Sequence, residues 1–221
     1  MTRKERYEGV LKWFKENNPN PETELNYTNA YQLIVAVILS AQCTDKRVNM
    51  VTPALFEAFP TVESLAASSP EEILNYIKSV SYPNNKAKHL HGMAKAVVSD
   101  FEGQVPEQQD ELVKLPGVGR KTANVVASVF FDVPAIAVDT HVFRVSRRIG
   151  LVPQTSNTPD KVESQLTKYI PQDLWSKAHH WLILHGRYIC VARSPLCSGC
   201  GISEYCWHHS RNIKRLKISE Q

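Results

Sequence analysis

The spacing of apolar residues constrains this fold more than any other feature, because it is helical along almost the whole chain. Residues 4–17 place four apolar side chains on one stripe, and residues 29–40 are apolar nearly all round beyond their first turn. The first pattern is typical of an amphipathic helix and the second of a helix buried in a core. The nearest approach to a strand is the short stretch 135–138. The sequence therefore predicts an all-α fold with short loops.

Local start and stop signals add further helices. Ser69-Pro70-Glu71-Glu72 combines a serine cap, a proline in the first turn and a glutamate at the capping-box position, which together start a helix strongly. By periodicity, we expect the remaining helices at residues 86–101, 107–114, 120–131, 140–150, 158–170 and 174–188. The stretch 132–134 is the best candidate for a break between a central helical block and a C-terminal one.

The composition is that of a globular protein. Hydrophobic residues make up 43% of the 221 residues and charged residues 22%, which fits neither a disordered nor a collagen-like chain. The longest apolar run, residues 33–39, is too short to cross a bilayer. The charged start Met1-Thr2-Arg3-Lys4 does not resemble a signal peptide. We therefore expect a cytoplasmic protein without a membrane partner.

The basic residues are unevenly distributed along the chain. Arg144, Arg147 and Arg148 have no acidic residue among their immediate neighbours, and residues 187–217 contain six basic residues but only one acid, Glu204. Basic patches favour a polyanion, because binding releases counterions from a phosphate backbone. A solvated face would have the same charges, so charge alone leaves both interpretations open.

Four of the five cysteines lie within seventeen residues, in the pattern C-x6-C-x2-C-x5-C. They are Cys190, Cys197, Cys200 and Cys206. Thiolates so close in sequence can converge on one zinc ion or one iron–sulfur cluster. A single tight pair flanked by wider gaps favours the larger [4Fe–4S] cluster over zinc. Such a cluster could be redox-active or could rigidify a basic loop, and Arg193 inside the loop favours the second role.

The stretch Gly117-Val118-Gly119-Arg120-Lys121-Thr122 matches neither a P-loop nor a dinucleotide fingerprint, since both the glycine spacing and a preceding strand are missing. A short helix, a tight Leu115-Pro116-Gly117-Val118-Gly119 turn and a second helix fit better. Glycines allow a sharp turn and close approach of a ligand, and the free N–H groups at a helix start bind a phosphate. The sequence thus predicts a helix–hairpin–helix element that contacts DNA without reading bases.

Lys121 lies in the first turn of the second of these helices. The positive end of a helix and an adjacent arginine both destabilise an ammonium group, and an uncharged amine is a nucleophile. The simpler alternative is a lysine that only contacts phosphate. Eighteen residues later, Asp139 follows an apolar run and precedes a helix, where it could be a cap. A meeting of Asp139 and Lys121 across a cleft would instead suit attack on a sugar carbon.

With these motifs the chain resembles the endonuclease III family of the helix–hairpin–helix superfamily. Members of this family are DNA glycosylases and abasic-site lyases. The resemblance rests on the cysteine pattern and on residues 24–45, 115–126, 135–148 and 179–190. It implies a six-helix domain at 23–133, and a [4Fe–4S] domain made of 1–22 with 134–221. It also implies a monomer, associated with the nucleoid, that binds duplex DNA holding an oxidised pyrimidine or an abasic site, and flips the damaged base out.

The resemblance further assigns individual roles. Lys121 matches the nucleophile that attacks C1′ of the sugar, expels the base and forms a Schiff base, after which β-elimination nicks the strand. Asp139 matches the aspartate that assists the attack. Gln42 matches the residue that fills the gap left by the flipped nucleotide, and Tyr82 occupies the position of a wedge that enters the base stack.

One stretch departs from the family. Relatives commonly have Gly-Leu-Tyr or Gly-Phe-Tyr before an Asn-x-Lys-Ala motif, where this chain has Ser81-Tyr82-Pro83 before Asn84-Asn85-Lys86-Ala87. An aromatic residue at 82 can still wedge and stack, but Pro83 changes the backbone of the loop. The departure bears on the wedge and on the preference for the opposite base, and it leaves the chemistry of Lys121 untouched.

Two other functions share these motifs. An adenine-mismatch glycosylase has the same fold and cluster, but it lacks a lysine at the position of Lys121. A non-catalytic DNA-binding or redox-sensing module could use the same hairpin and cluster. In sequence, only Lys121 together with Asp139 separates that module from an enzyme.

Overall fold

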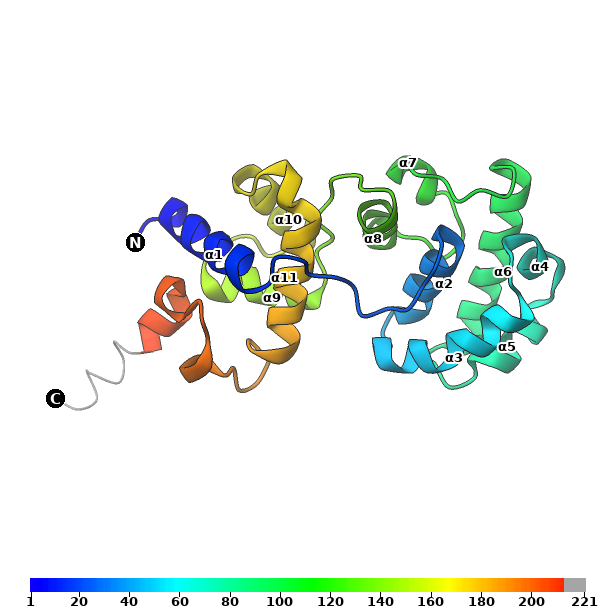
Figure 1. The fold of residues 1–221 in the computed structure, drawn as a ribbon, viewed down its shortest axis with the longest axis horizontal. Helices are drawn as coiled ribbons and strands as arrows, with labels where there is room; N and C mark the ends of the chain where they lie inside the picture. The colour runs from blue at the N-terminus through cyan, green and yellow to red at the C-terminus, as the bar shows by residue number, and fades with distance from the viewer. Residues whose placement is uncertain (213–221) are drawn as a thin grey trace. The chain divides into compact units, whose positions relative to one another are not determined.

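The computed structural model describes residues 1–212 and confirms the all-α prediction (Figure 1). Within this range there is no strand. The α-helices are α1 (Arg3–Asn17), α2 (Ala30–Ser40), α3 (Asp45–Ala58), α4 (Val62–Ala67), α5 (Pro70–Ile77), α6 (Pro83–Asp100), α7 (Gln109–Leu112), α8 (Arg120–Phe130), α9 (Thr140–Ile149), α10 (Pro159–Tyr169) and α11 (Trp175–Tyr188). Short 3₁₀ turns are η1 (Gln172–Leu174), η2 (Cys197–Gly199) and η3 (Ser203–Tyr205). No helix within 1–212 has both the length and the apolar character that a membrane span requires.

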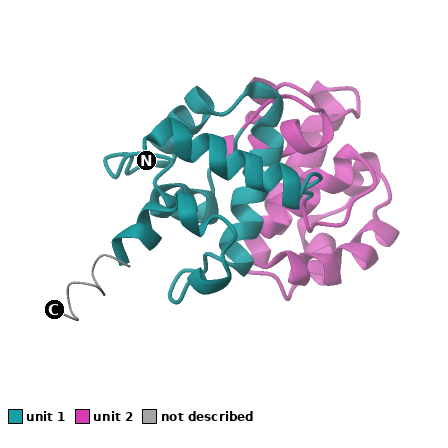
Figure 2. Ribbon diagram, turned by 60° about the vertical axis from the view of Figure 1, so that its left-hand side comes forward, with its two compact units in different colours: residues 1–22, 136–221 teal, residues 23–135 magenta. Residues whose placement is uncertain are grey.

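The chain divides into two compact units, coloured separately in Figure 2. Unit 2 is Thr23–Ala135, and unit 1 joins Met1–Glu22 to the chain from Ile136 onward. The N-terminal helix therefore packs with the C-terminal part of the chain rather than with the helices that follow it.

The core of unit 2 is built around α2. Every residue from 33 to 39 is buried, so this helix has no solvent face beyond its first turn. It packs against α3, α6 and α8, while α4 and α5 pack against α6. Asn29 caps the start of α2 by accepting a hydrogen bond from the Gln32 backbone N–H at 2.9 Å. Full burial of each aliphatic side chain contributes about 1.5–3 kcal/mol, which makes α2 the main hydrophobic anchor of the unit.

The core of unit 1 joins α1 to α11 and α9. The Phe14 ring stacks on Trp181 with centroids 5.5 Å apart, and the Trp181 Nε1–H donates to the carbonyl of Asn18 at 2.6 Å. On α9, one face is buried through Val142, Val145 and Ile149. α9 packs against α11 and α10. These contacts explain why residues 1–22 belong to this unit.

The observed elements correct the sequence-based boundaries in three places. The short helix before the glycine turn spans only Gln109–Leu112, not 107–114. α6 begins at Pro83 rather than 86, because proline is well suited to the first helical position. The helices α3 and α4 were not predicted individually, although Thr44 and Thr61 cap them through hydrogen bonds to the N–H groups of Arg47 and Ser64.

Candidate functional site

The glycine turn of the predicted hairpin joins α7 to α8. Gly117 has φ +78°, and a Cβ at this position would lie 2.6 Å from the Cβ of His89. Only glycine satisfies both conditions without strain. Gly119 is the N-cap of α8 and has no side chain to cap it, and the first backbone bond of the helix runs from Ala123 N–H to Gly119 C=O at 2.9 Å. The N–H groups of residues 121 and 122 therefore have no acceptor within the helix and can bind an anion.

Lys121 is the second residue of α8, and its side chain is exposed, as are Gly119 and Arg120 beside it. Within residues 1–212, no hydrogen bond or ion pair engages the Lys121 amine. Val118, in contrast, is buried and anchors the turn, and its N–H donates to the Leu115 carbonyl at 3.0 Å. The hairpin thus presents an unengaged primary amine in the first turn of α8, where backbone N–H groups lack an acceptor within the helix.

Asp139 lies in unit 1 at the start of α9 and is half-buried. Its Oδ1 accepts a hydrogen bond from the Val142 backbone N–H at 2.7 Å, so the residue is the N-cap of that helix. The carboxylate therefore has a structural role whatever else it does. Lys121 belongs to unit 2.

Gln42 and Tyr82 are both exposed and both have φ 53°, in the left-handed region that L-residues with side chains rarely adopt. Tyr82 is 61% exposed, which is unusual for so large an aromatic residue. It is the N-cap residue of α6, immediately before Pro83. Hydrogen bonds from Ser81 and Lys86 link the two loops that carry Gln42 and Tyr82, and the sequence predicted no role for either residue.

The cysteine segment is fastened to α9 by arginine side chains. The Nη2 of Arg144 donates to the Gly186 carbonyl at 2.8 Å and to the Cys190 carbonyl at 3.3 Å. Arg148 donates from Nη1 to the Val191 carbonyl at 2.7 Å and from Nη2 to the Ala192 carbonyl at 2.9 Å. These cations, which could have belonged to a polyanion site, bind the backbone instead. Three further basic residues of the predicted patch, Lys214, Arg215 and Lys217, lie outside the described residues.

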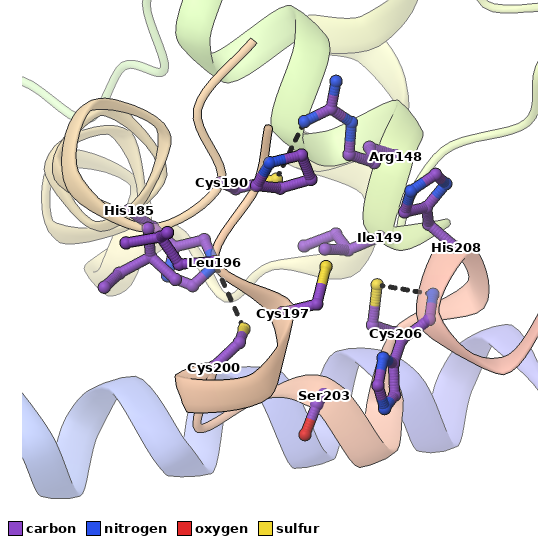
Figure 3. A pocket seen from close by; sticks show the side chains of 13 residues that line it. Arg148, Ile149, His185, Cys190, Leu196, Cys197, Cys200, Ser203, Cys206 and His208 are labelled. Carbon is purple, nitrogen blue, oxygen red and sulfur yellow. Dashed lines mark hydrogen bonds between the residues drawn. The ribbon is translucent and has the colours of Figure 1, made fainter. Parts of the chain in front are cut away.

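The four clustered cysteines line one cavity, shown in Figure 3. Its empty volume is about 310 Å³, part of which is open to solvent, and apolar side chains including Ile149 and Leu196 complete its wall. All four thiols are free of disulfides. The structure thus brings Cys190, Cys197, Cys200 and Cys206 together around a single space.

The surroundings of the sulfur atoms fit a bound iron–sulfur cluster. Burial raises the pKa of Cys200 and of Cys206, and the neighbouring thiols raise it further. Several thiolates gathered in such a place need a cation to offset their charge, and iron provides it. N–H groups also point at the sulfurs: Arg148 Nη1 lies 3.6 Å from Cys190 Sγ, and the His209 backbone N–H lies 3.5 Å from Cys206 Sγ. Hydrogen bonds of this kind stabilise cluster thiolates.

Comparisons with known proteins match the segment that contains the hairpin and the segment that contains the cysteines. Residues 35–172 match the HhH-GPD superfamily of base excision DNA repair proteins, and residues 190–206 match the iron–sulfur binding domain of endonuclease III. The chain is 48% identical to the endonuclease III of Rickettsia felis over 92% of its own length and 95% of that protein. It is 43% identical to the Escherichia coli endonuclease III, over 89% of this chain and 92% of that one.

Among solved structures, the chain is similar to a trapped covalent intermediate of an endonuclease III with DNA. The TM-score is 0.90 at 43% sequence identity, and the match covers 96% of this chain and 100% of the other. Since the match with that covalent complex extends over almost the whole chain, it includes both the hairpin and the cysteine segment.

Proposed function

The chain belongs to the endonuclease III family of base excision DNA repair proteins, and from this premise we propose which of its residues perform the reaction. It is a DNA glycosylase with abasic-site lyase activity and carries an iron–sulfur cluster. Its substrate class is DNA with an oxidised pyrimidine, from which it removes the base before cutting the strand. The observation that carries the assignment of residues is the unengaged Lys121 amine at the start of α8.

Lys121 is the nucleophile. Its Nζ, as the free amine, bonds to C1′ of the damaged nucleotide while the bond from C1′ to the base breaks, and the base leaves with the electron pair and takes up a proton. Opening of the sugar ring then gives a Schiff base between Nζ and C1′. Loss of a proton from C2′ expels the 3′ phosphate and cuts the strand, and water releases the enzyme. A similar enzyme has been trapped as a covalent intermediate with DNA, which supports this route.

Asp139 is the acid that assists the attack. An ionised carboxylate stabilises the positive charge that develops on the sugar as the base departs. The bond from Val142 N–H to Oδ1 fixes the orientation of the side chain at the start of α9. Capping and catalysis are thus compatible in one residue.

The turn at Gly117, Val118 and Gly119, with Arg120, holds the DNA backbone. Backbone N–H groups at the start of α8 donate hydrogen bonds to a phosphate, and the arginine adds charge without reading the sequence. Gln42 fills the gap left by the extruded nucleotide, and Tyr82 wedges into the base stack. Their exposure leaves both side chains accessible to a duplex.

The cluster, held by Cys190, Cys197, Cys200 and Cys206, rigidifies the segment that contains Arg193. When bound, it supplies charge compensation for the four thiolates and cross-links η2 and η3 to the end of α11. The proposed domains are residues 23–133, and 1–22 with 134–221; a unit boundary after Ala135 supports this division. We further propose that the enzyme acts as a monomer on nucleoid DNA in the cytoplasm.

The test of this function uses two duplexes. One carries a thymine glycol and the other an adenine opposite 8-oxoguanine. We expect release of the thymine glycol base and a nick at the same site, with no adenine release from the second duplex. Release of adenine without a nick would instead assign the chain to the mismatch-specific relatives, and binding without base release would leave only a DNA-binding module.

A further inference from the structure

A buried lysine lies beneath the two loops that carry Gln42 and Tyr82. Lys86, on α6, is only 5% exposed. Its Nζ donates to the carbonyl of Leu39 at 2.8 Å, to the carbonyl of Ala41 at 2.7 Å and to Ser81 Oγ at 3.2 Å. An ammonium group has three protons, so each of them has an acceptor here. A buried charge is tolerated only when it is satisfied in this way.

Ser81, in the loop that carries Tyr82, also contacts the loop that carries Gln42. Its Oγ donates to the carbonyl of Gln42 at 2.7 Å, and the carbonyl of Ala41 lies 3.3 Å from the same atom. Lys86 and Ser81, which we call the clasp, therefore connect the end of α2 and the Gln42 loop to the residue directly before Tyr82. All of these contacts lie within unit 2.

The clasp lies where the backbone needs support. Ser81 precedes Tyr82 in the chain, and its hydroxyl donates to the carbonyl of Gln42. Both Gln42 and Tyr82 have φ 53°. Residues with side chains stay in this left-handed region only when surrounding contacts hold them there. The hydrogen bond to the Gln42 carbonyl is such a contact, and it constrains the backbone of both loops together.

We propose that Ser81 and Lys86 are positioning residues that hold Gln42 and Tyr82 in the shape with which they enter the duplex. The proposal rests on the roles assigned above to Gln42 and Tyr82. Because the two loops are fixed to each other before DNA arrives, less conformational freedom is lost when both side chains insert. A glycine at 81, which is common in the family, has no hydroxyl and cannot make this link, so the clasp through Ser81 is a property of this chain.

The test compares Ser81→Ala with Ser81→Thr, which keeps the hydroxyl. Ser99→Ala is the matched control, since Ser99 lies in the same unit and its Oγ bonds only its neighbour Asp100 at 2.7 Å. Each protein is titrated with a duplex that contains a tetrahydrofuran abasic-site analogue and 2-aminopurine in the opposite strand, so that fluorescence reports insertion into the stack. Amide hydrogen exchange of residues 41–43 and 81–83 is followed in the free proteins.

We expect Ser81→Ala to bind this duplex roughly 3- to 10-fold more weakly, as the loss of one hydrogen bond predicts. Its 2-aminopurine signal should fall, and exchange in both loops should be faster. Strand cleavage at an abasic site in a single-stranded oligonucleotide should stay unchanged, because no opposite strand has to be accommodated. Ser81→Thr and Ser99→Ala should behave like the unmodified protein.

Two further variants separate the clasp from the roles it serves. If Gln42→Ala and Tyr82→Ala weaken binding while Ser81→Ala changes neither fluorescence nor exchange, the clasp is refuted and the assigned DNA contacts stand. If Gln42→Ala and Tyr82→Ala also bind like the unmodified protein, the assigned contacts are wrong and the clasp has no function to support.

Discussion

The Oδ1 atom of Asp139 lies 2.7 Å from the backbone nitrogen of Val142 and accepts its hydrogen bond, so the proposed catalytic carboxylate is also the N-cap of α9. A substitution that removes the side chain therefore changes both the chemistry and the stability of unit 1. The two effects have to be separated by the choice of replacement.

Asp139→Asn should slow base removal strongly while unfolding like the unmodified protein, because asparagine caps a helix as well as aspartate but has no charge. Asp139→Ala should lose the activity and also about 1 kcal/mol of stability, through the missing cap. Single-turnover release of thymine glycol and denaturant unfolding measure the two effects. Full activity of Asp139→Asn would limit Asp139 to a structural role.

Substitution of the two glycines of the hairpin by alanine should change the free energy of unfolding by different amounts. Gly117→Ala would place a side chain at φ +78° and against His89, and should lower the free energy of unfolding by about 1–2 kcal/mol. At Gly119 the backbone has φ −86°, and an added Cβ would meet nothing within 4 Å. Gly119→Ala should therefore cost less, about 0.5 kcal/mol, because it meets no steric strain and loses only the preference of an N-cap for glycine over alanine. Equal losses in thermal unfolding would show that the strain at Gly117 is not what demands glycine.

The sequence could predict the parts of this structure that depend on local patterns. Helical period and caps located most helices, and the spacing of the cysteines identified a shared centre. The helix α3 could not be predicted from its apolar period, which is weak because the helix is polar and contains Pro53, although Thr44 caps it. The contacts of Arg144 and Arg148 with carbonyl groups could not be read from sequence, since their partners lie more than forty residues away. The same is true of the clasp at Ser81.

A buried histidine should make unit 1 sensitive to acid. Burial, with His179 and Arg187 nearby, lowers the pKa of His180 from 6.5 to about 3. Between these two values the unfolded chain binds a proton that the folded chain does not. The contribution of His180 to the free energy of unfolding is therefore fully present above pH 6.5 and is lost progressively as the pH falls toward 3. When the pH is lowered from 8 to 5, the free energy of unfolding of His180→Leu should fall by about 2 kcal/mol less than that of the unmodified protein. Parallel profiles from urea unfolding would contradict this.

Loss of the cluster should loosen unit 1 alone. The cysteine segment packs on α1, where Arg6 Nε donates to the Tyr205 carbonyl at 2.7 Å and the Tyr205 ring lies against Gly9. Cys197→Ala should lose its iron and brown colour, and amide exchange should become faster in residues 3–17 and 190–206. Exchange in α2, which belongs to unit 2, should not change. Faster exchange throughout both units would mean that the cluster supports the whole chain.

The most direct test of the account is to trap the bond between Lys121 and DNA. The protein is mixed with a duplex that contains an abasic site, borohydride is added, and the adduct is digested and mapped by mass spectrometry. We expect a covalent adduct on Lys121, none with Lys121→Gln, and a normal yield with Lys95→Gln, which alters an exposed lysine on α6. An adduct that persists in Lys121→Gln, or that maps to another residue, would contradict the assignment of Lys121 as the nucleophile.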